Sequence, residues 1–128
     1  MIVDTDVLVW DLRGNVRAKD RLMEGVPFSV SVVTYIDLIQ GMRNRDELRT
    51  LARQLDQWSV SILQIDSGIS SRAMYFVETF FLSHSMQLAD AIIGATAVSK
   101  GTKLLTANAK HYRHLPDIEL EVFEPEEV

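Results

Sequence analysis

The sequence predicts a three-layer α/β/α sandwich with a mostly parallel central sheet. Three observations support this fold class. Short β-branched or apolar runs alternate with segments of helical periodicity along the chain, and neither an internal repeat nor a linker interrupts them. The length of 128 residues suits a single domain with one core. A hydrophobic fraction of 47% and a charged fraction of 24% are ordinary for a globular chain.

Five segments have the composition of strands. They are residues 1–4, 28–33, 60–65, 102–107 and 118–122. The third of these, "VSILQI", could be a strand or an extended connector. The last, "IELEV", is expected at an edge of the sheet, because its acidic residues alternate with apolar ones.

The segments between the strands have helical character. We expect helices over residues 6–13, 17–25, 34–42, 45–58, 67–84 and 88–101, and a last helical turn over 109–115. Gly14, Gly25 and Gly101 are expected to end three of them. The 3–4 spacing of Leu48, Leu51, Leu55 and Trp58 predicts a helix with one apolar side. In the helix over 67–84, we expect the following residues to belong to the core: Met74, Phe76, Val77, Phe80 and Phe81.

Composition excludes several classes of protein. The chain has no cysteine, which rules out a disulfide framework, a zinc knuckle and a thiol nucleophile. No apolar stretch approaches the roughly 18 residues that span a bilayer, and acids at positions 4 and 6 do not fit a signal peptide. We therefore expect a cytoplasmic protein without a membrane partner.

The formal net charge of -5 hides an uneven distribution. Six acids lie in the tail over residues 117–128, and without them 12 acids face 13 Lys and Arg. The segment over residues 99–115 contains no acid. Its basic and histidine residues are Lys100, Lys103, Lys110, Arg113, His111 and His114. A second basic series, Arg43, Arg45, Arg49 and Arg53, is interpreted as the solvated face of a helix.

Polar residues recur where predicted strands end or the following helices begin. These are Asp4, Asp37, Asp90 and Asn108. Asp37 also matches a capping box with Thr34, and Asn108 could cap the turn that begins at Ala109. Asp6 could cap the first helix, but that leaves Asp4 unexplained.

Asp90 has no simple structural explanation. Its helix carries small residues near the same side, Gly94, Ala97 and Gly101, so neighbouring backbone can pack close to it. No Lys or Arg lies between Arg72 and Lys100 to offset its charge. A carboxylate in such a place needs a cation, a hydrogen-bond network or a proton.

Strand ends in an α/β sheet converge on one edge, so the four polar residues could form a single acidic site. Clustered carboxylates repel one another unless a divalent cation neutralises them, and oxygen-only ligands favour Mg²⁺ or Mn²⁺. Such a site suits phosphodiester hydrolysis, because the cation activates water and offsets charge in the transition state.

Four segments of the chain resemble PIN-domain ribonucleases, and specifically the VapC toxins of toxin–antitoxin pairs. They are "MIVDTDVLVWDLRGN", "SVSVVTYIDLIQGM", "LADAIIGATA" and "LLTANAKHYRHLPDIEL". They resemble, in order, the family's opening strand with its D-T-[NS] turn, its S-x-x-T-x-x-E-L-x-x-G segment, its D-A-x-I-A-A-T-A helix and its L-x-T-x-[ND]-x-x-x-[FY] ending. The resemblance covers nearly the whole chain.

The resemblance implies that Asp4, Asp37 and Asp90 hold Mg²⁺ or Mn²⁺ and that Asn108 completes the catalytic set. Asp6 and Thr106 are expected to support these residues. The resemblance also implies RNA cleavage, homodimerisation and neutralisation by a VapB-type antitoxin, and family antitoxins commonly insert a basic side chain among the carboxylates. The basic residues expected to contact RNA are Lys103, Lys110 and Arg113.

Two residues depart from the family pattern. Asp37 stands where Glu is usual and is one methylene shorter, while Asp6 stands where Asn or Ser is commoner. Asp37 therefore leaves open a catalytically eroded PIN domain that binds RNA or protein. Asp4-Thr5-Asp6 also resembles the D-x-D of haloacid-dehalogenase-type phosphatases, although no later acid pair follows Lys103 and Lys110 in a suitable loop.

Overall fold

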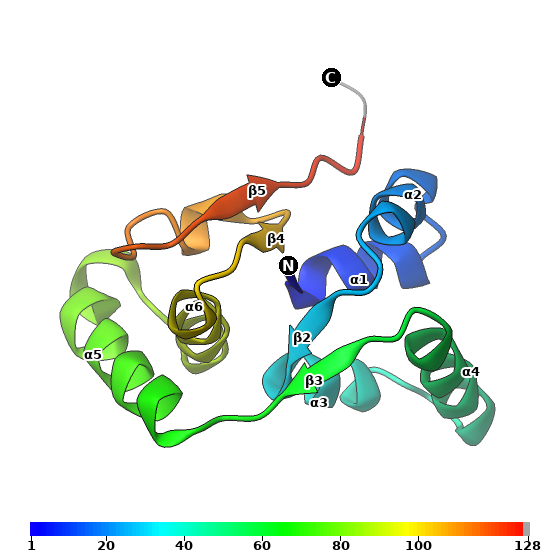
Figure 1. The fold of residues 1–128 in the computed structure, drawn as a ribbon, viewed down its shortest axis with the longest axis horizontal. Helices are drawn as coiled ribbons and strands as arrows, with labels where there is room; N and C mark the ends of the chain where they lie inside the picture. The colour runs from blue at the N-terminus through cyan, green and yellow to red at the C-terminus, as the bar shows by residue number, and fades with distance from the viewer. Residues whose placement is uncertain (127–128) are drawn as a thin grey trace.

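Five parallel strands form the central sheet of the computed structural model, which describes residues 1–126 (Figure 1). The last two residues of the predicted acidic tail, 127 and 128, lie outside the described part. The strands are β1 (Ile2–Val3), β2 (Ser29–Ser31), β3 (Ser61–Leu63), β4 (Leu104–Thr106) and β5 (Leu120–Val122). Their order in the sheet is β3-β2-β1-β4-β5. The predicted α/β class is confirmed, and every strand pairing is parallel.

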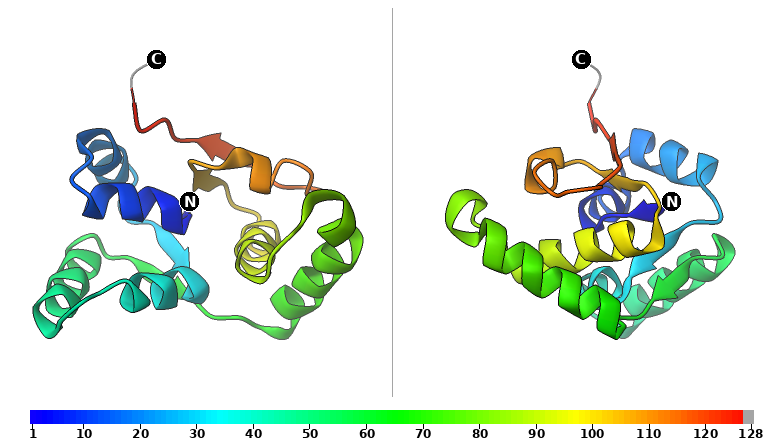
Figure 2. Two further views of the ribbon diagram at one scale, coloured as in Figure 1. Left: turned by 180° about the vertical axis from the view of Figure 1, so that it is seen from behind. Right: turned by 60° about the vertical axis from the view of Figure 1, so that its left-hand side comes forward.

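Helices cover both faces of the sheet. They are α1 (Thr5–Leu12), α2 (Val16–Glu24), α3 (Val32–Gln40), α4 (Arg45–Gln57), α5 (Ser67–His84) and α6 (Leu88–Lys100), with a short 3₁₀ turn η1 (Ala109–His111) after β4. Figures 1 and 2 show α5 and α6 side by side on one face, and α1, α2 and α4 on the other. Neighbouring strand residues alternate between the two layers. Val3 belongs to the core beneath α1, α2 and α4, and Ile2 belongs to the core beneath α5 and α6.

The topology makes β1 the centre of the sheet. From β1 the chain builds β2 and β3 on one side, then crosses over to add β4 and β5 on the other. The strand order therefore reverses between β1 and β4, and ligands of open α/β sheets bind at the carboxyl ends of the strands at such a point. Asp4 directly follows β1, and Thr106 is the last residue of β4.

Three helices begin earlier than the sequence predicted, and α2 does so by one residue, at Val16. The first begins at Thr5, with Asp4 rather than Asp6 at the N-cap. The helix after β2 begins at Val32, where the Ser31 hydroxyl accepts a hydrogen bond from the Val33 amide at 3.1 Å. The predicted capping box of Thr34 and Asp37 is therefore wrong.

The expected core of α5 is only partly correct. Phe76 is buried and Val77 and Phe80 are half-buried, but Met74 is 62% exposed and Phe81 is 50% exposed. The apolar side chains of α5 point in several directions, and the buried ones lie on the side that packs against α6. In α4, Leu51 and Leu55 are buried as predicted, whereas Leu48 is 40% exposed.

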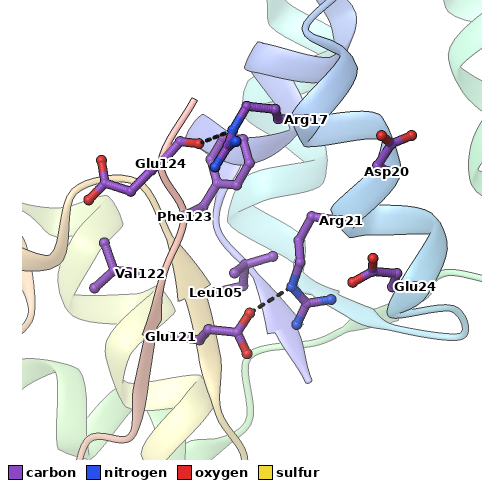
Figure 3. A pocket seen from close by; sticks show the side chains of 9 residues that line it. All are labelled: Arg17, Asp20, Arg21, Glu24, Leu105, Glu121, Val122, Phe123 and Glu124. Carbon is purple, nitrogen blue, oxygen red and sulfur yellow. Dashed lines mark hydrogen bonds and ion pairs between the residues drawn. The ribbon is translucent and has the colours of Figure 1, made fainter. Parts of the chain in front are cut away.

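The C-terminal segment lies against α2 (Figure 3). Arg21 Nε donates to Glu121 Oε2 at 2.6 Å, and Arg17 Nε donates to the Glu124 carbonyl at 3.0 Å. Asn15 Nδ2 donates to the Pro125 carbonyl at 3.0 Å. These contacts hold β5 at the edge of the sheet, where the sequence predicted it. A cavity of about 360 Å³ lies between α2 and this segment.

Within residues 1–126, the helices are too short or too polar for any of them to cross a membrane.

Candidate active site

Asp4 is buried at the carboxyl end of β1, with both carboxylate oxygens occupied. Its Oδ1 accepts from the Thr5 amide at 2.8 Å, and its Oδ2 accepts from the Thr106 hydroxyl at 2.8 Å. Burial and the charge of Asp6 raise the pKa of Asp4 to about 7. The hydrogen bonds from the Thr106 hydroxyl and the Thr5 amide partly oppose this shift. The local structure thus places a protonatable carboxyl group at the carboxyl ends of the neighbouring strands β1 and β4.

Asp6 lies in the first turn of α1 and reaches across to the loop after β4. Its Oδ2 accepts from the Ala107 amide at 3.1 Å and from Asn108 Nδ2 at 3.3 Å. Burial raises the pKa of Asp6. Asn108 precedes η1, but its side chain makes no capping hydrogen bond there. The capping explanation for Asn108 is therefore wrong, and its side chain instead joins the acidic pair.

Thr106 links these groups. Besides donating to Asp4, its hydroxyl accepts from the Asn108 amide at 3.0 Å. Thr106 is fully buried at the end of β4. One hydroxyl therefore fixes both a carboxylate from the start of the chain and the backbone of the loop that carries Asn108.

Asp90, in the first turn of α6, contacts two residues that the sequence interpretation missed. The Tyr112 hydroxyl donates to Asp90 Oδ1 at 3.2 Å, and His111 Nδ1 lies 3.2 Å from Asp90 Oδ2. The partners thus come from η1 and the residue after it. The sequence signal for Tyr112 is the aromatic position that ends the family's last segment, and His111 lies in the acid-free basic segment over residues 99–115.

Asp37 is exposed on α3 and, among residues 1–126, its side chain makes no hydrogen bond or ion pair. Its helix is nevertheless tied to the site. The Thr5 hydroxyl donates to the buried Thr34 hydroxyl at 2.9 Å, next to Asp4. Residues three apart lie on neighbouring positions of a helix surface, so Asp37 follows Thr34 one turn further along α3.

The predicted RNA-contacting residues do not lie together. Lys110 lines a cavity of about 330 Å³ beside Asp90, together with His111 and Gln87. Lys103 precedes β4, at the opposite end of that strand from Thr106, and its Nζ lies 3.8 Å from Glu121 Oε1. Arg113 is exposed beyond η1.

The donor chemistry at Asp4 and Asp6 fits a hard divalent cation. Asp6 Oδ1 is buried and has no hydrogen-bond partner in the described part of the chain. Neither carboxylate forms an ion pair with a Lys or Arg from residues 1–126. In that same range, no three His, Cys, Asp or Glu side chains are grouped so that they could hold a metal ion. The structure therefore assembles Asp4 and Asp6, while the wider set with Asp37 and Asp90 stays a prediction.

Comparison with known proteins identifies the family. The family model described as "PIN domain" matches residues 1–115. The chain belongs to the PIN-domain family. It is 35% identical over 116 residues to Ribonuclease VapC10 of Mycobacterium tuberculosis, across 88% of this chain and 85% of that protein. The resemblance to VapC proteins predicted from the four segments is thus confirmed.

Chains of solved structures described as toxin–antitoxin or VapBC complexes share the fold over nearly the full chain. A toxin–antitoxin complex from Klebsiella pneumoniae matches with a TM-score of 0.74 and 26% identity, over 99% of this chain and 98% of that one. VapBC2 from Rickettsia felis, bound to a promoter DNA fragment, matches with a TM-score of 0.78 over 96% and 98% of the two chains. Its identity is 14%, so this second likeness concerns the fold alone. The match to the PIN-domain family contradicts the haloacid-dehalogenase-type alternative.

Proposed function

We propose that this PIN-domain protein is a VapC-type toxin, an endoribonuclease that hydrolyses RNA phosphodiester bonds with Mg²⁺ or Mn²⁺. The observation that carries the proposal is the hydrogen-bonded group of Asp4, Asp6, Thr106 and Asn108 at the switch point of the sheet. The 35% identity to Ribonuclease VapC10 also supports the proposal.

The residues of this group have separable tasks in hydrolysis. Asp4 and Asp6 would hold the cation, with Asp90 and Asp37 closing the site from α6 and α3. The bound cation would lower the pKa of a water molecule and offset charge on the phosphate. Thr106 keeps Asp4 in place through its 2.8 Å hydrogen bond, and Asn108 keeps Asp6 in place. This preorganisation matters because positioned charges stabilise a transition state without further rearrangement.

RNA would approach over the cavity beside Asp90. Lys110 and His111 line that cavity and bring positive or protonatable groups next to the carboxylates. A phosphate backbone is held chiefly by such side chains, without sequence discrimination. Lys103 has an acidic neighbour in Glu121 and lies at the amino end of β4, away from the carboxylates, so Lys110 carries most of the proposed contact.

A VapB-type antitoxin is the proposed protein partner. The similar structures include complexes described as VapBC or toxin–antitoxin assemblies. Asp4 and Asp6 lack a Lys or Arg ion-pair partner within residues 1–126, so a basic side chain from an antitoxin would complement them. A basic side chain bound to Asp4 and Asp6 would also exclude the cation.

Homodimerisation is proposed together with the antitoxin. Helix α5 presents Met74, Phe81 and Leu82 to solvent, and Leu82 is 96% exposed. Contiguous exposed apolar side chains are typical of protein interfaces. Light scattering on the purified chain should give the mass of two copies, and Leu82→Glu should shift it toward one.

The test of the proposed activity is cleavage of total bacterial RNA by the chain purified free of any partner. Wild type, Asp90→Asn and the exposed control Asp20→Asn are incubated with Mn²⁺, with Mg²⁺ and with EDTA. We expect discrete fragments from wild type and from Asp20→Asn with a metal, and none with EDTA or from Asp90→Asn.

Other patterns would change the interpretation. Fragments that persist in EDTA would contradict metal dependence. RNA binding without cleavage under any metal would favour the eroded PIN domain, with Asp37 as the first residue to restore to Glu.

A further inference from the structure

The three histidines of the chain gather around one cavity beside Asp90. His84, from the last turn of α5, and His111, from η1, both line this cavity of about 330 Å³. The third, His114, stacks on His84, with ring centroids 4.0 Å apart and ring planes inclined by 16°. A cavity of this size is at the lower end of the range for small-ligand sites. His84 and His114 thus adjoin the candidate cation site without belonging to it.

The ring of His84 is held in place by the end of its helix. α5 ends at His84 because Ser85 takes the left-handed conformation, with a φ of 53°, and the Ser85 amide donates to the Phe81 carbonyl at 2.8 Å. In the same turn, the Ser83 hydroxyl lies 2.7 Å from His84 Nδ1. A ring that is already oriented loses little side-chain entropy when a flat ligand covers it.

His114 supports the His84 ring from the core side. Its Nε2 lies 3.2 Å from the sulfur of the buried Met86, and its ring packs edge-on against Phe80 with centroids 4.7 Å apart. Phe80 is half-buried and packs against the core beneath α5 and α6. The rings therefore form a continuous series that starts at the core and ends at His84. His114 covers one face of the His84 ring, and because His84 is exposed, the other face is open to a ligand.

Polar groups in the cavity lining fit a nucleotide. Gln87 directly precedes α6 but makes no capping hydrogen bond there, and its Nε2 donates to the Ser85 carbonyl at 3.0 Å. A side-chain amide both donates to and accepts from the edge of a base. Lys110 forms no ion pair in the described part of the chain, so its ammonium group is free to contact a phosphate. The cavity therefore combines a flat ring, an amide and a cation.

We propose that the cavity between α5, α6 and η1 binds one unstacked base of the RNA substrate, with His84 as the surface on which the base stacks and Gln87 as the group that reads its edge. This inference rests on the proposed ribonuclease function. Single-stranded RNA is recognised by bases that leave the stack and lie on aromatic side chains, histidine included. Asp90 lines the same cavity, so a base held there determines which phosphodiester bond reaches the carboxylates.

Binding of the RNA backbone alone predicts a different dependence. If the cavity held only a phosphate through Lys110, a strand without bases would bind as tightly as a complete one. Stacking of a base on an aromatic side chain, by contrast, typically strengthens binding by about 5- to 150-fold.

The first measurement compares two short fluorescent strands by anisotropy in EDTA, which prevents metal-dependent cleavage. One is an oligoribonucleotide of random sequence, and the other is a ribose-phosphate strand of equal length without bases. Wild type should bind the complete strand at least about 5-fold more tightly. His84→Ala should lose this difference, and His84→Trp, which keeps a flat ring, should retain it. Equal binding of the two strands by wild type, or an undiminished difference in His84→Ala, would overturn the proposal.

Two further variants separate stacking from charge and from general effects of a lost ring. Lys110→Gln should weaken binding of both strands by the same factor, because a lysine contacts the backbone. Tyr75→Ala removes a ring that is 52% exposed on α5 and does not line the cavity, so it should bind both strands as wild type does. A base dependence that Tyr75→Ala loses as fully as His84→Ala would contradict the assignment to His84.

The second measurement uses the ends of the RNA fragments that wild type produces in Mn²⁺. Sequencing should show a preferred base at one position beside the cut, and Gln87→Ala should relax this preference while Tyr75→Ala keeps it. Cleavage by wild type without any base preference there would overturn the base site and leave the proposed activity standing. If wild type cuts no RNA with any metal, the proposed activity fails, and the binding comparison in EDTA still decides the base site.

Discussion

The Thr106 hydroxyl donates a 2.8 Å hydrogen bond to Asp4 Oδ2 and thereby joins the ends of β1 and β4. The two residues are 102 positions apart in the sequence, and both are buried. Because the same hydroxyl accepts from the Asn108 amide, one side chain determines the position of a carboxylate and of the loop opposite it.

Replacing Thr106 with valine should therefore weaken both the fold and the site. Valine keeps the shape but leaves Asp4 Oδ2 and the Asn108 amide without this partner, at a cost of about 1–3 kcal/mol. Urea unfolding of Thr106→Val should show this loss, and RNA cleavage should fall at least 10-fold. Thr79→Val, at an exposed position on α5, serves as the control and should match wild type in both assays. A Thr106→Val protein as stable as wild type would contradict the role given to this hydroxyl.

Stability of the metal-free chain should fall as pH rises through the range between about 4 and 7. Burial and the charge of Asp6 raise the pKa of Asp4 to about 7 from 3.8, so the folded state binds a proton that the unfolded state has released. The free energy of unfolding then decreases with pH across this window. Asp4→Asn removes this contribution. The unfolding free energy of the variant minus that of wild type should therefore be larger at pH 8 than at pH 4, by on the order of 2–4 kcal/mol. Urea titrations of both proteins at these pH values make the comparison. A difference between them that does not vary with pH would be inconsistent with a buried, protonatable Asp4.

Enlarging Gly94 should displace Tyr112 and Leu115. A valine Cβ would meet Leu115 Cδ1 at 2.6 Å, and its methyl groups would extend further toward the tyrosine ring. Overpacking of this kind costs about 1–3 kcal/mol. Gly94→Val should lose that much stability in urea unfolding and should also weaken Mn²⁺ binding. Gly68→Ala, where a Cβ would approach only Asp66 Oδ1 at 3.4 Å, is expected to retain Mn²⁺ affinity. Full Mn²⁺ affinity in Gly94→Val would argue against coupling between this packing and the site.

The ion pair of Arg21 and Glu121 should contribute to stability without affecting cleavage. Arg21 lowers the pKa of Glu121, so the stabilisation is present above the ordinary pKa of a glutamate and is lost as pH falls through the lowered value. The pair is partly exposed, so Arg21→Gln should cost up to about 1 kcal/mol at neutral pH and less at high salt. Unfolding midpoints at pH 7 and pH 3 test this. Reduced RNA cleavage in Arg21→Gln would contradict the prediction, because it would show that the contact between α2 and the C-terminal segment affects the activity of the site.

The order of elements could be predicted from the sequence because each depends on local patterning. Alternating strand and helix patterns gave the parallel α/β fold, and the alternating acids of residues 118–122 gave the edge strand. The start of α3 could not be predicted in this way. The β-branched run before Thr34 favours a strand, yet Val32 and Val33 enter the helix because Ser31 caps it.

The site was predictable in part for a similar reason. The convergence of strand ends predicts that Asp4 and Asn108 lie close together, and in the structure they are linked through Asp6 and Thr106. The contact of Tyr112 with Asp90 depends on how the turn after β4 packs over Gly94, which no local pattern specifies. The exposure of Met74 and Phe81 likewise depends on which side of α5 contacts α6.

The rate at which the purified chain cleaves an oligoribonucleotide mixture in Mn²⁺ tests the central claim most directly when wild type is compared with Asp4→Asn. Asp4→Asn preserves the volume of a buried side chain and removes its charge. We predict metal-dependent internal cleavage by wild type, abolished by EDTA, and at least a 100-fold lower rate for Asp4→Asn. Cleavage by Asp4→Asn at the wild-type rate would contradict the assignment of this site as the centre of a metal-dependent ribonuclease.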